Sequence, residues 1–311
     1  TIAHHAAAGG HTELLQWILS VAELGGEFLK RQADDGDTIA HAAARTNQVD
    51  VLQWITNTSE LGTAFLATAR DDGSTIAHNA AAGGHRGVLQ WILLQWIISA
   101  AELGGNLLKR QAGNGDTIAH AAARNNRVSV LKWIANTPAL GTLLAIPRND
   151  GGTIAHHAAA GGHTELLQWI LSVAELGGEF LKRQADDGDT IAHAAARTNQ
   201  VDVLQWITNT SELGTAFLAT ARDDGSTIAH NAAAGGHRGV LQWILLQWII
   251  SAAELGGNLL KRQAGNGDTI AHAAARNNRV SVLKWIANTP ALGTLLAIPR
   301  NDGGTIAHHA A

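Results

Sequence analysis

Apolar residues recur along this chain at the spacing of an amphipathic helix. In residues 12–22, Leu, Trp, Ile, Val and Ala recur three or four positions apart, while Glu13, Gln16 and Ser20 lie off this apolar face. This spacing predicts a helix that buries one broad side. Related segments occur throughout the chain, so we expect many helices of this kind.

A shorter alanine-rich segment precedes each of these helices. After Thr38, for example, the chain reads Ile-Ala-His-Ala-Ala-Ala-Arg. Threonine is a favoured N-cap, and alanine combines the best helix propensity with little bulk, so a first helix here can pack closely on its neighbours. Gly9-Gly10 or Thr46-Asn47 then ends it. No segment shows the alternating pattern of a strand, so we expect an all-α fold.

The pair of helices belongs to a unit that recurs in register. Residues 1–152 return letter for letter as residues 153–304, and a third copy starts at residue 305 and runs to residue 311. Within a block, successive units are 37, 37, 42 and 36 residues long. Such periodicity is typical of a stacked array. We therefore divide the chain into four repeats, an identical copy of them and the start of a third copy, and expect a segment of a longer periodic chain.

The repeated motifs resemble those of ankyrin repeats. Asp35-Gly36-Asp37-Thr38 resembles the Asp-Gly-x-Thr turn of that family, Thr38-Ile39-Ala40-His41 its Thr-Pro-Leu-His, and Gly10-His11 the Gly-His between its two helices. The resemblance covers all eight units. It implies an ankyrin-like repeat solenoid of helix-turn-helix units that binds proteins. Isoleucine replaces the usual proline, and the units exceed the family's length of about 33 residues.

The additional length lies after the second helix. Segments such as Ala-Glu-Leu-Gly-Gly-Glu-Phe-Leu-Lys-Arg-Gln and Thr-Pro-Ala-Leu-Gly-Thr-Leu-Leu occupy this place. Thr137-Pro138 has the form of an N-cap followed by proline at the first helical position. We therefore expect a short third helix in each unit.

Each unit carries a histidine three residues after its threonine. In the family that the chain resembles, this histidine is structural and bonds the threonine turn. A ladder of zinc ligands is the alternative, but stacked helices lie ~8–10 Å apart and each Zn–N bond is ~2.0–2.1 Å long. His5 and His11 lack the spacing of a helical zinc site. We expect no metal site, and assign turn and cap roles to Thr38, His41, Thr75, His78, Thr117 and His120.

The acidic turns raise a calcium hypothesis. Residues 34–37 and 71–74 contain paired aspartates, but the equivalent turns 113–116 and 149–152 do not. Calcium requires six to eight oxygen ligands, so turns that also favour the start of a helix are the better interpretation.

Composition excludes several classes of function. The net charge of −4, from 22 basic and 26 acidic residues, is too small and too mixed to indicate a nucleic acid or an anionic membrane as partner. The apolar run at 88–101 is too short to span a bilayer. Cysteine is absent, and we find no nucleophile elbow, phosphate loop or dinucleotide fingerprint. We expect no catalytic site and no cofactor.

Tryptophan is the largest apolar side chain that recurs. Trp17, Trp54, Trp91 and Trp133 occupy one equivalent position, where we expect them to pack between adjacent units. The third unit carries five extra residues around Trp96. Five residues lengthen a helix by ~7.5 Å and rotate the rest of the helix by ~140°, so the two tryptophans of this unit cannot face the same neighbour.

Part of this insertion therefore protrudes once per block, or the short third helix folds back over it. A protruding aromatic and aliphatic cluster marks a protein-contact surface. The candidate residues are Leu94, Trp96, Ile97, Ile98, Leu246, Trp248, Ile249 and Ile250.

Identical blocks favour a structural role. We expect a non-enzymatic array that associates with itself and forms an extended scaffold or filament. The alternative is a protein-binding adaptor of the ankyrin type, which would need variation between units for specificity.

Overall fold

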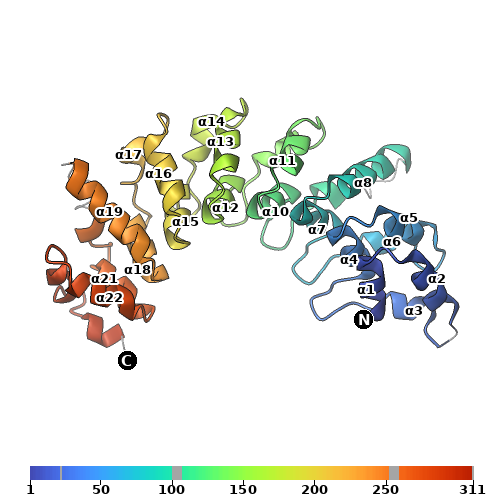
Figure 1. Cartoon of the computed structure of the whole chain (residues 1–311), viewed down its shortest axis with the longest axis horizontal. Coiled ribbons are helices and arrows are strands. Elements are labelled where there is room, and N and C mark those ends of the chain that lie inside the picture. The colour runs from blue at the N-terminus through green and yellow to red at the C-terminus, as the bar shows by residue number, and fades with distance from the viewer. Residues whose placement is uncertain (22, 100–106, 252–258, 310–311) are drawn as a thin grey trace. The chain divides into compact units, whose positions relative to one another are not determined.

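The computed structural model describes residues 1–21, 23–99, 107–251 and 259–309, and the side chains at 96–99 and 248–251 are outside this description. Every regular element in these ranges is a helix (Figure 1). The chain divides into two compact units, Thr1–Asp150 and Gly151–Ala311, which we describe one at a time.

The first unit contains four repeats of helices. Each has a first helix, a longer second helix and, in three of them, a described short third helix. In order these are α1(Ile2–Ala8), α2(Thr12–Ser20), α3(Gly25–Leu29), α4(Ile39–Arg45), α5(Val49–Asn57), α6(Gly62–Leu66), α7(Ile76–Gly83), α8(Arg86–Ser99), α10(Ile118–Arg124), α11(Val128–Ala135) and η1(Gly141–Leu144).

The second unit has the same order of elements. They are α12(Ile154–Ala160), α13(Thr164–Ser172), α14(Gly177–Leu181), α15(Ile191–Arg197), α16(Val201–Asn209), α17(Gly214–Phe217), α18(Ile228–Gly235), α19(Arg238–Ser251), α21(Ile270–Arg276), α22(Val280–Ala287) and η2(Gly293–Leu296). A further turn, η3(Ile306–His309), packs against α21.

The repeats stack in chain order within each unit. In the first unit α1, α4, α7 and α10 contact one another successively, and so do α2, α5, α8 and α11. Ala40 and Ala43 in α4 are fully buried, which shows why small side chains let the first helices approach one another. The apolar face of the second helix is buried at Leu15 and Ile18. The expected all-α repeat solenoid is confirmed.

The links between first and second helices require unusual backbone angles. Asn47 adopts a φ of 64° and Gly10 a φ of 77°, in the left-handed region. Asparagine and glycine tolerate this region best, which explains why each ends a first helix.

Two details of the predicted elements were wrong. The second helix of the first repeat ends at Ser20, and Val21 is already extended. The third helix of the fourth repeat does not start at Thr137-Pro138, because Thr137 bonds back to the carbonyl of Trp133 at 2.8 Å and so closes the preceding helix. A 3₁₀ turn, η1, forms instead from Gly141.

The packing expected for the tryptophans was wrong at Trp17, which is 58% exposed. Trp91 and Trp133 are only 7% and 8% exposed, and Trp54 is half-buried. The copy of Trp17 in the second unit, Trp169, is half-buried.

Candidate protein-contact site

The Thr–His pairs form bonded caps at the starts of the first helices. Nδ1 of His41 accepts the backbone N–H of Thr38 at 3.3 Å and lies 2.9 Å from the threonine hydroxyl. The distances are 3.2 and 3.0 Å for Thr75 with His78. They are 3.2 and 3.1 Å for Thr117 with His120. The six turn and cap residues thus lie in three equivalent local pairs.

The rings of the first and third repeats also reach the following repeat. Because Nδ1 accepts an N–H bond, the proton of the neutral ring sits on Nε2. Nε2 of His78 donates to the carbonyl of Asp116 at 3.0 Å, and Nε2 of His4 to that of Asp37 at 2.9 Å. Each of these rings therefore joins its own helix start to the next turn.

Burial keeps several of these histidines neutral. It lowers the pKa of His41 to about 4, although the Asp37 carboxylate opposes the shift. Burial, assisted by the charge of Arg222, lowers the pKa of His193 to about 4. It also lowers the pKa of His78 and that of His230. His78 and His230 bond through both nitrogens as neutral rings, which is a structural role.

A charged cluster links the turns between repeats. The Asp37 side chain is only 8% exposed and pairs with Arg45 of its own first helix. Nε of Arg70, in the next turn, lies 3.1 Å from Oδ1 of Asp37, and Arg70 also pairs with Asp35. Asn79 donates to the carbonyl of His41 at 3.4 Å. The cluster therefore joins the turn that holds Asp35 and Asp37 to helix α4 and to the next turn at Arg70, and Asn79 connects helix α7 to α4 beside it.

Sequence reasoning missed this cluster, because it treated the aspartates only as turn and cap residues. Asp116 repeats the arrangement with Arg124 and with Arg148, whose Nε lies 3.1 Å from it. The available signal was an arginine eight residues after each of these aspartates and another before the following turn.

The long second helix is the feature that recurs once per 152 residues. Helix α8 spans 14 residues, against 9 in α2 and 8 in α11. Leu94 on α8 and its copy Leu246 on α19 are both 52% exposed. We call α8 and α19 the contact helices. The other predicted contact side chains, Trp96, Ile97, Ile98, Trp248, Ile249 and Ile250, lie outside the described side chains.

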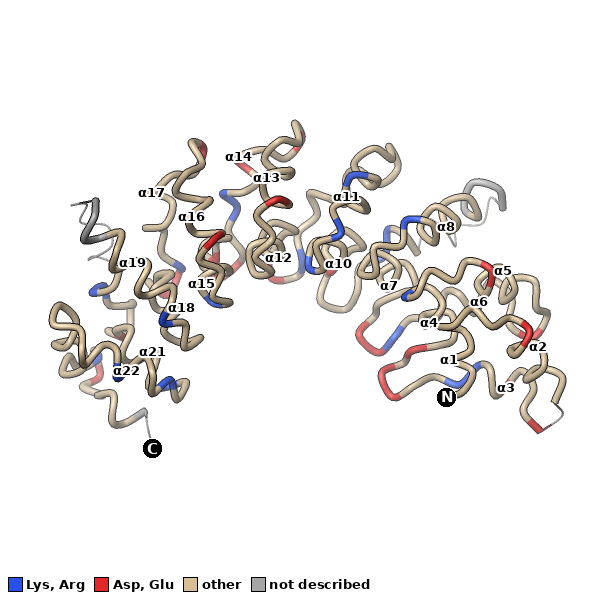
Figure 2. The backbone as a smooth tube through the Cα atoms, in the orientation of Figure 1, with Lys and Arg blue, Asp and Glu red and all other residues tan. Residues whose placement is uncertain are grey.

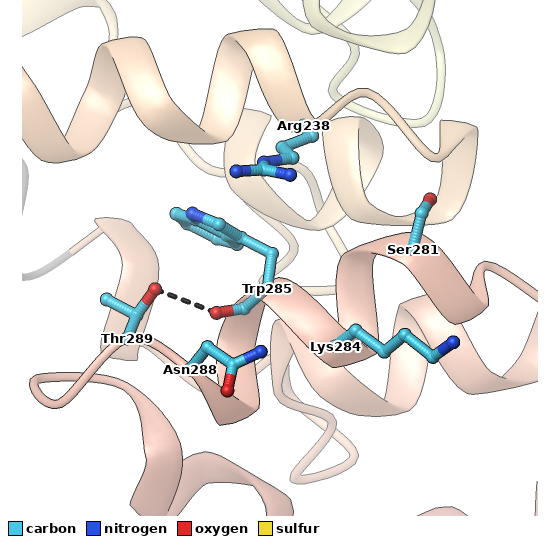
Figure 3. Close-up of a pocket in the computed structure, with 6 residues that line it drawn as sticks. All are labelled: Arg238, Ser281, Lys284, Trp285, Asn288 and Thr289. Carbon is cyan, nitrogen blue, oxygen red and sulfur yellow. Dashed lines mark hydrogen bonds between the residues drawn. The ribbon is translucent and has the colours of Figure 1, made fainter.

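A shallow pocket lies between second helices of the last two repeats of the second unit (Figure 3). It has a volume of about 480 Å³, and Arg238 from α19 and Trp285 from α22 point toward one another across it. Lys284, Ser281, Asn288 and Thr289 complete its lining. The two cations in the lining suit an anionic group such as a carboxylate.

A second pocket, of about 400 Å³, lies among the turns of the same two repeats. Asp223, Asp224 and Asp268 line it together with Arg276. The main chain already joins these turns, since Gly265 donates to the carbonyl of Asp224 at 2.7 Å. This contact serves the stacking of the repeats.

The described residues contain no group of three or more His, Asp or Glu side chains placed to hold a metal ion. Within the same ranges, no helix has the length and apolar character needed to cross a bilayer.

Comparison with known families is consistent with the geometry. The family model described as "Ankyrin repeats (3 copies)" matches residues 3–100 and 78–177, and that described as "Ankyrin repeats (many copies)" matches residues 155–208. Among curated proteins, none matches the chain.

Proposed function

Because the chain belongs to the ankyrin-repeat family, we propose that it is a non-enzymatic scaffold whose regular contacts are made with further copies of itself. Repeat proteins of this family typically bind proteins. A stacked array also offers extended surfaces for such contacts.

The observation that carries the proposal is the contact helix in each block. Helices α8 and α19 exceed the other second helices by about one turn or more, and each exposes a leucine over half of its surface. Exposed apolar clusters on a soluble protein mark interaction sites. A contact helix repeated every 152 residues suits a neighbour that has the same repeat, as in a filament or an extended scaffold.

Identity between the blocks also supports self-association. A partner of unrelated sequence is selected by side chains that differ from one repeat to the next, whereas residues 1–152 and 153–304 do not differ at all. A lattice of identical contacts needs no such differences. A binding adaptor for another protein is the alternative, and the four non-identical repeats within each block favour it.

The test replaces Trp96 and Trp248 by serine in one variant. We expect this variant to lose assembly, measured by sedimentation velocity and electron microscopy, and to keep the helical circular dichroism of the unchanged protein. Trp17→Ser, which alters an exposed tryptophan away from the contact helices, serves as the control and should assemble normally. Unchanged assembly of the double variant would refute the role of these helices, and a chain that never assembles would favour the adaptor.

A further inference from the structure

The net charge of successive repeats changes steeply within each block, although the whole chain carries a net charge of only −4. Residues 1–37 carry 6 acidic and 2 basic side chains, and residues 38–74 carry 4 and 2. Residues 75–116 carry 2 acidic and 3 basic side chains, and residues 117–152 carry 1 and 4. The four repeats therefore have net charges of −4, −2, +1 and +3, so that one half of the block is at −6 and the other at +4.

Part of the gradient lies on the second helices. Glu13 in α2 and Asp50 in α5 are exposed, and the corresponding part of the next two repeats exposes Arg86 in α8 and Lys132 in α11. Figure 2 shows this change from acidic to basic residues along the helices of the first unit. Two exposed residues beside these helices add to the same surfaces: Glu60, after α5, is acidic, and Arg127, before α11, is basic.

The turns also carry charge, part of which is paired. Arg70 pairs there with Asp35 and Asp37, and Arg148 pairs with Asp116 and Asp150. Charges that pair within the turns largely cancel at a distance, whereas the second helices carry one sign in the first two repeats and the other sign in the last two. Complementary fields of this kind orient partners and suppress wrong pairings.

The pocket of Figure 3 lies in the basic half of the second unit. Its two cations, Arg238 and Lys284, come from the third and the fourth repeat; Arg238 lies beside the Trp285 ring, and the Lys284 side chain extends away from that ring (Figure 3). A carboxylate at this pocket meets the positive charge of Arg238, with that of Lys284 on the same lining. In the acidic half, the second helices α2 and α5 carry the exposed carboxylates of Glu13 and Asp50.

We propose that the second helices of one block bind those of a second copy in antiparallel order, with repeats 1–2 of each copy on repeats 4–3 of the other. Antiparallel order places every acidic half against a basic half, whereas parallel order in register places like charges together. The contact is self-complementary, as in a two-fold symmetric dimer. This proposal rests on the self-association proposed above and adds its orientation and its dependence on salt.

Ionic strength provides the first measurement. The distance over which charges act falls from ~10 Å at 0.1 M salt to ~3 Å at 1 M. We expect the dissociation constant of self-association, measured by sedimentation velocity, to rise about tenfold or more over this range. An association that keeps its strength in 1 M sodium chloride would overturn the proposal.

Charge reversal provides the decisive measurement. One variant carries Glu13→Lys, Asp50→Lys and Glu60→Lys with the same changes at Glu165, Asp202 and Glu212. The other carries Arg86→Glu, Arg127→Glu and Lys132→Glu with the same changes at Arg238, Arg279 and Lys284. Each variant alone should associate about tenfold more weakly than the unchanged chain, because like charges now face each other. An equimolar mixture of the two should recover association, which also shows that both variants are folded.

The outcomes separate this proposal from the proposed function. If both charge variants associate like the unchanged chain, or if their mixture associates no better than either alone, the antiparallel arrangement is wrong, while loss of assembly in the Trp96 and Trp248 variant still supports the contact helices. Recovery in the mixture with unchanged assembly of the tryptophan variant supports the charge pairing alone. A chain that stays monomeric from 0.1 to 1 M salt overturns both.

Discussion

Lowering the pH from 8 to 5 should weaken the fold through His41 and His193. Burial lowers the pKa of each to about 4, against 6.5 for a histidine exposed in the unfolded chain. Between these values the unfolded chain binds a proton that the folded chain does not bind. The free energy of unfolding is therefore highest above pH 6.5 and falls as the pH decreases toward 4.

The magnitude comes from this difference in proton binding. Each pKa unit corresponds to ~1.4 kcal/mol. Relative to pH 8, each of the two histidines therefore lowers the free energy of unfolding by about 2 kcal/mol at pH 5 and by about 3 kcal/mol at pH 4. His78 and His230 act in the same direction, since burial lowers their pKa too. The geometry acts in the same direction as burial, because Nδ1 of His41 already accepts an N–H from the threonine cap and a protonated Nδ1 would face that donor.

Equilibrium urea unfolding at pH 8, 7, 6 and 5, followed by circular dichroism, measures the effect. A variant with His41→Gln and His193→Gln should be less stable at pH 8 but should depend less on pH. For each histidine removed, the slope between pH 6 and 5 should fall by about 1 kcal/mol per pH unit. A chain whose stability does not change from pH 8 to 5, or a variant with the slope of the unchanged chain, would refute the assignment of buried neutral rings.

Two further predictions concern the turns. Replacing Asp37 and Asp189 by asparagine should lower the free energy of unfolding by about 2 kcal/mol per unit, because Arg45 and Arg70 lose a buried carboxylate partner. The control Asp34→Asn, at an exposed position of the same turn, should change it by less than about 0.5 kcal/mol. Urea titrations measure both values. Gly36→Ala and Gly62→Ala both place a side chain at a positive φ, which is 79° at Gly36 and 68° at Gly62. At Gly36 the new Cβ would lie 2.7 Å from the backbone nitrogen of Asp71, whereas at Gly62 it would meet no atom within 4 Å. Thermal melts should therefore show that Gly36→Ala lowers the free energy of unfolding by about 2 kcal/mol more than Gly62→Ala does. Equal decreases would show that the turns do not pack as described.

The helices of this fold could be predicted because their signals are local. Thr38 and the alanines after it specify a capped, thin helix, and the spacing around Leu15 and Ile18 specifies one buried face. In-register repetition then places each helix beside its equivalents without any knowledge of long-range contacts. This is why the all-α repeat architecture follows from the sequence.

Features that depend on neighbouring repeats were harder to predict. The pattern alone could not show that Trp17 is exposed while Trp91 is buried, because both occupy the same position in their repeats. Asp37 was predicted only as a turn residue, since its arginine partners lie 8 and 33 residues away. Thr137 resembled the start of a helix although its hydroxyl closes the preceding one. In each case a contact outside the local pattern decided the outcome.

The two nitrogens of the cap histidine have a consequence for how such a chain lengthens. Nδ1 accepts a bond inside the repeat, and in the first and third repeats of a block Nε2 donates to the turn that comes next, as His4 does to Asp37 and His78 to Asp116. The acceptor is a main-chain carbonyl, which every residue type provides. Duplication of a pair of repeats therefore recreates this junction without compensating mutations, because the acceptor does not depend on the identity of a side chain.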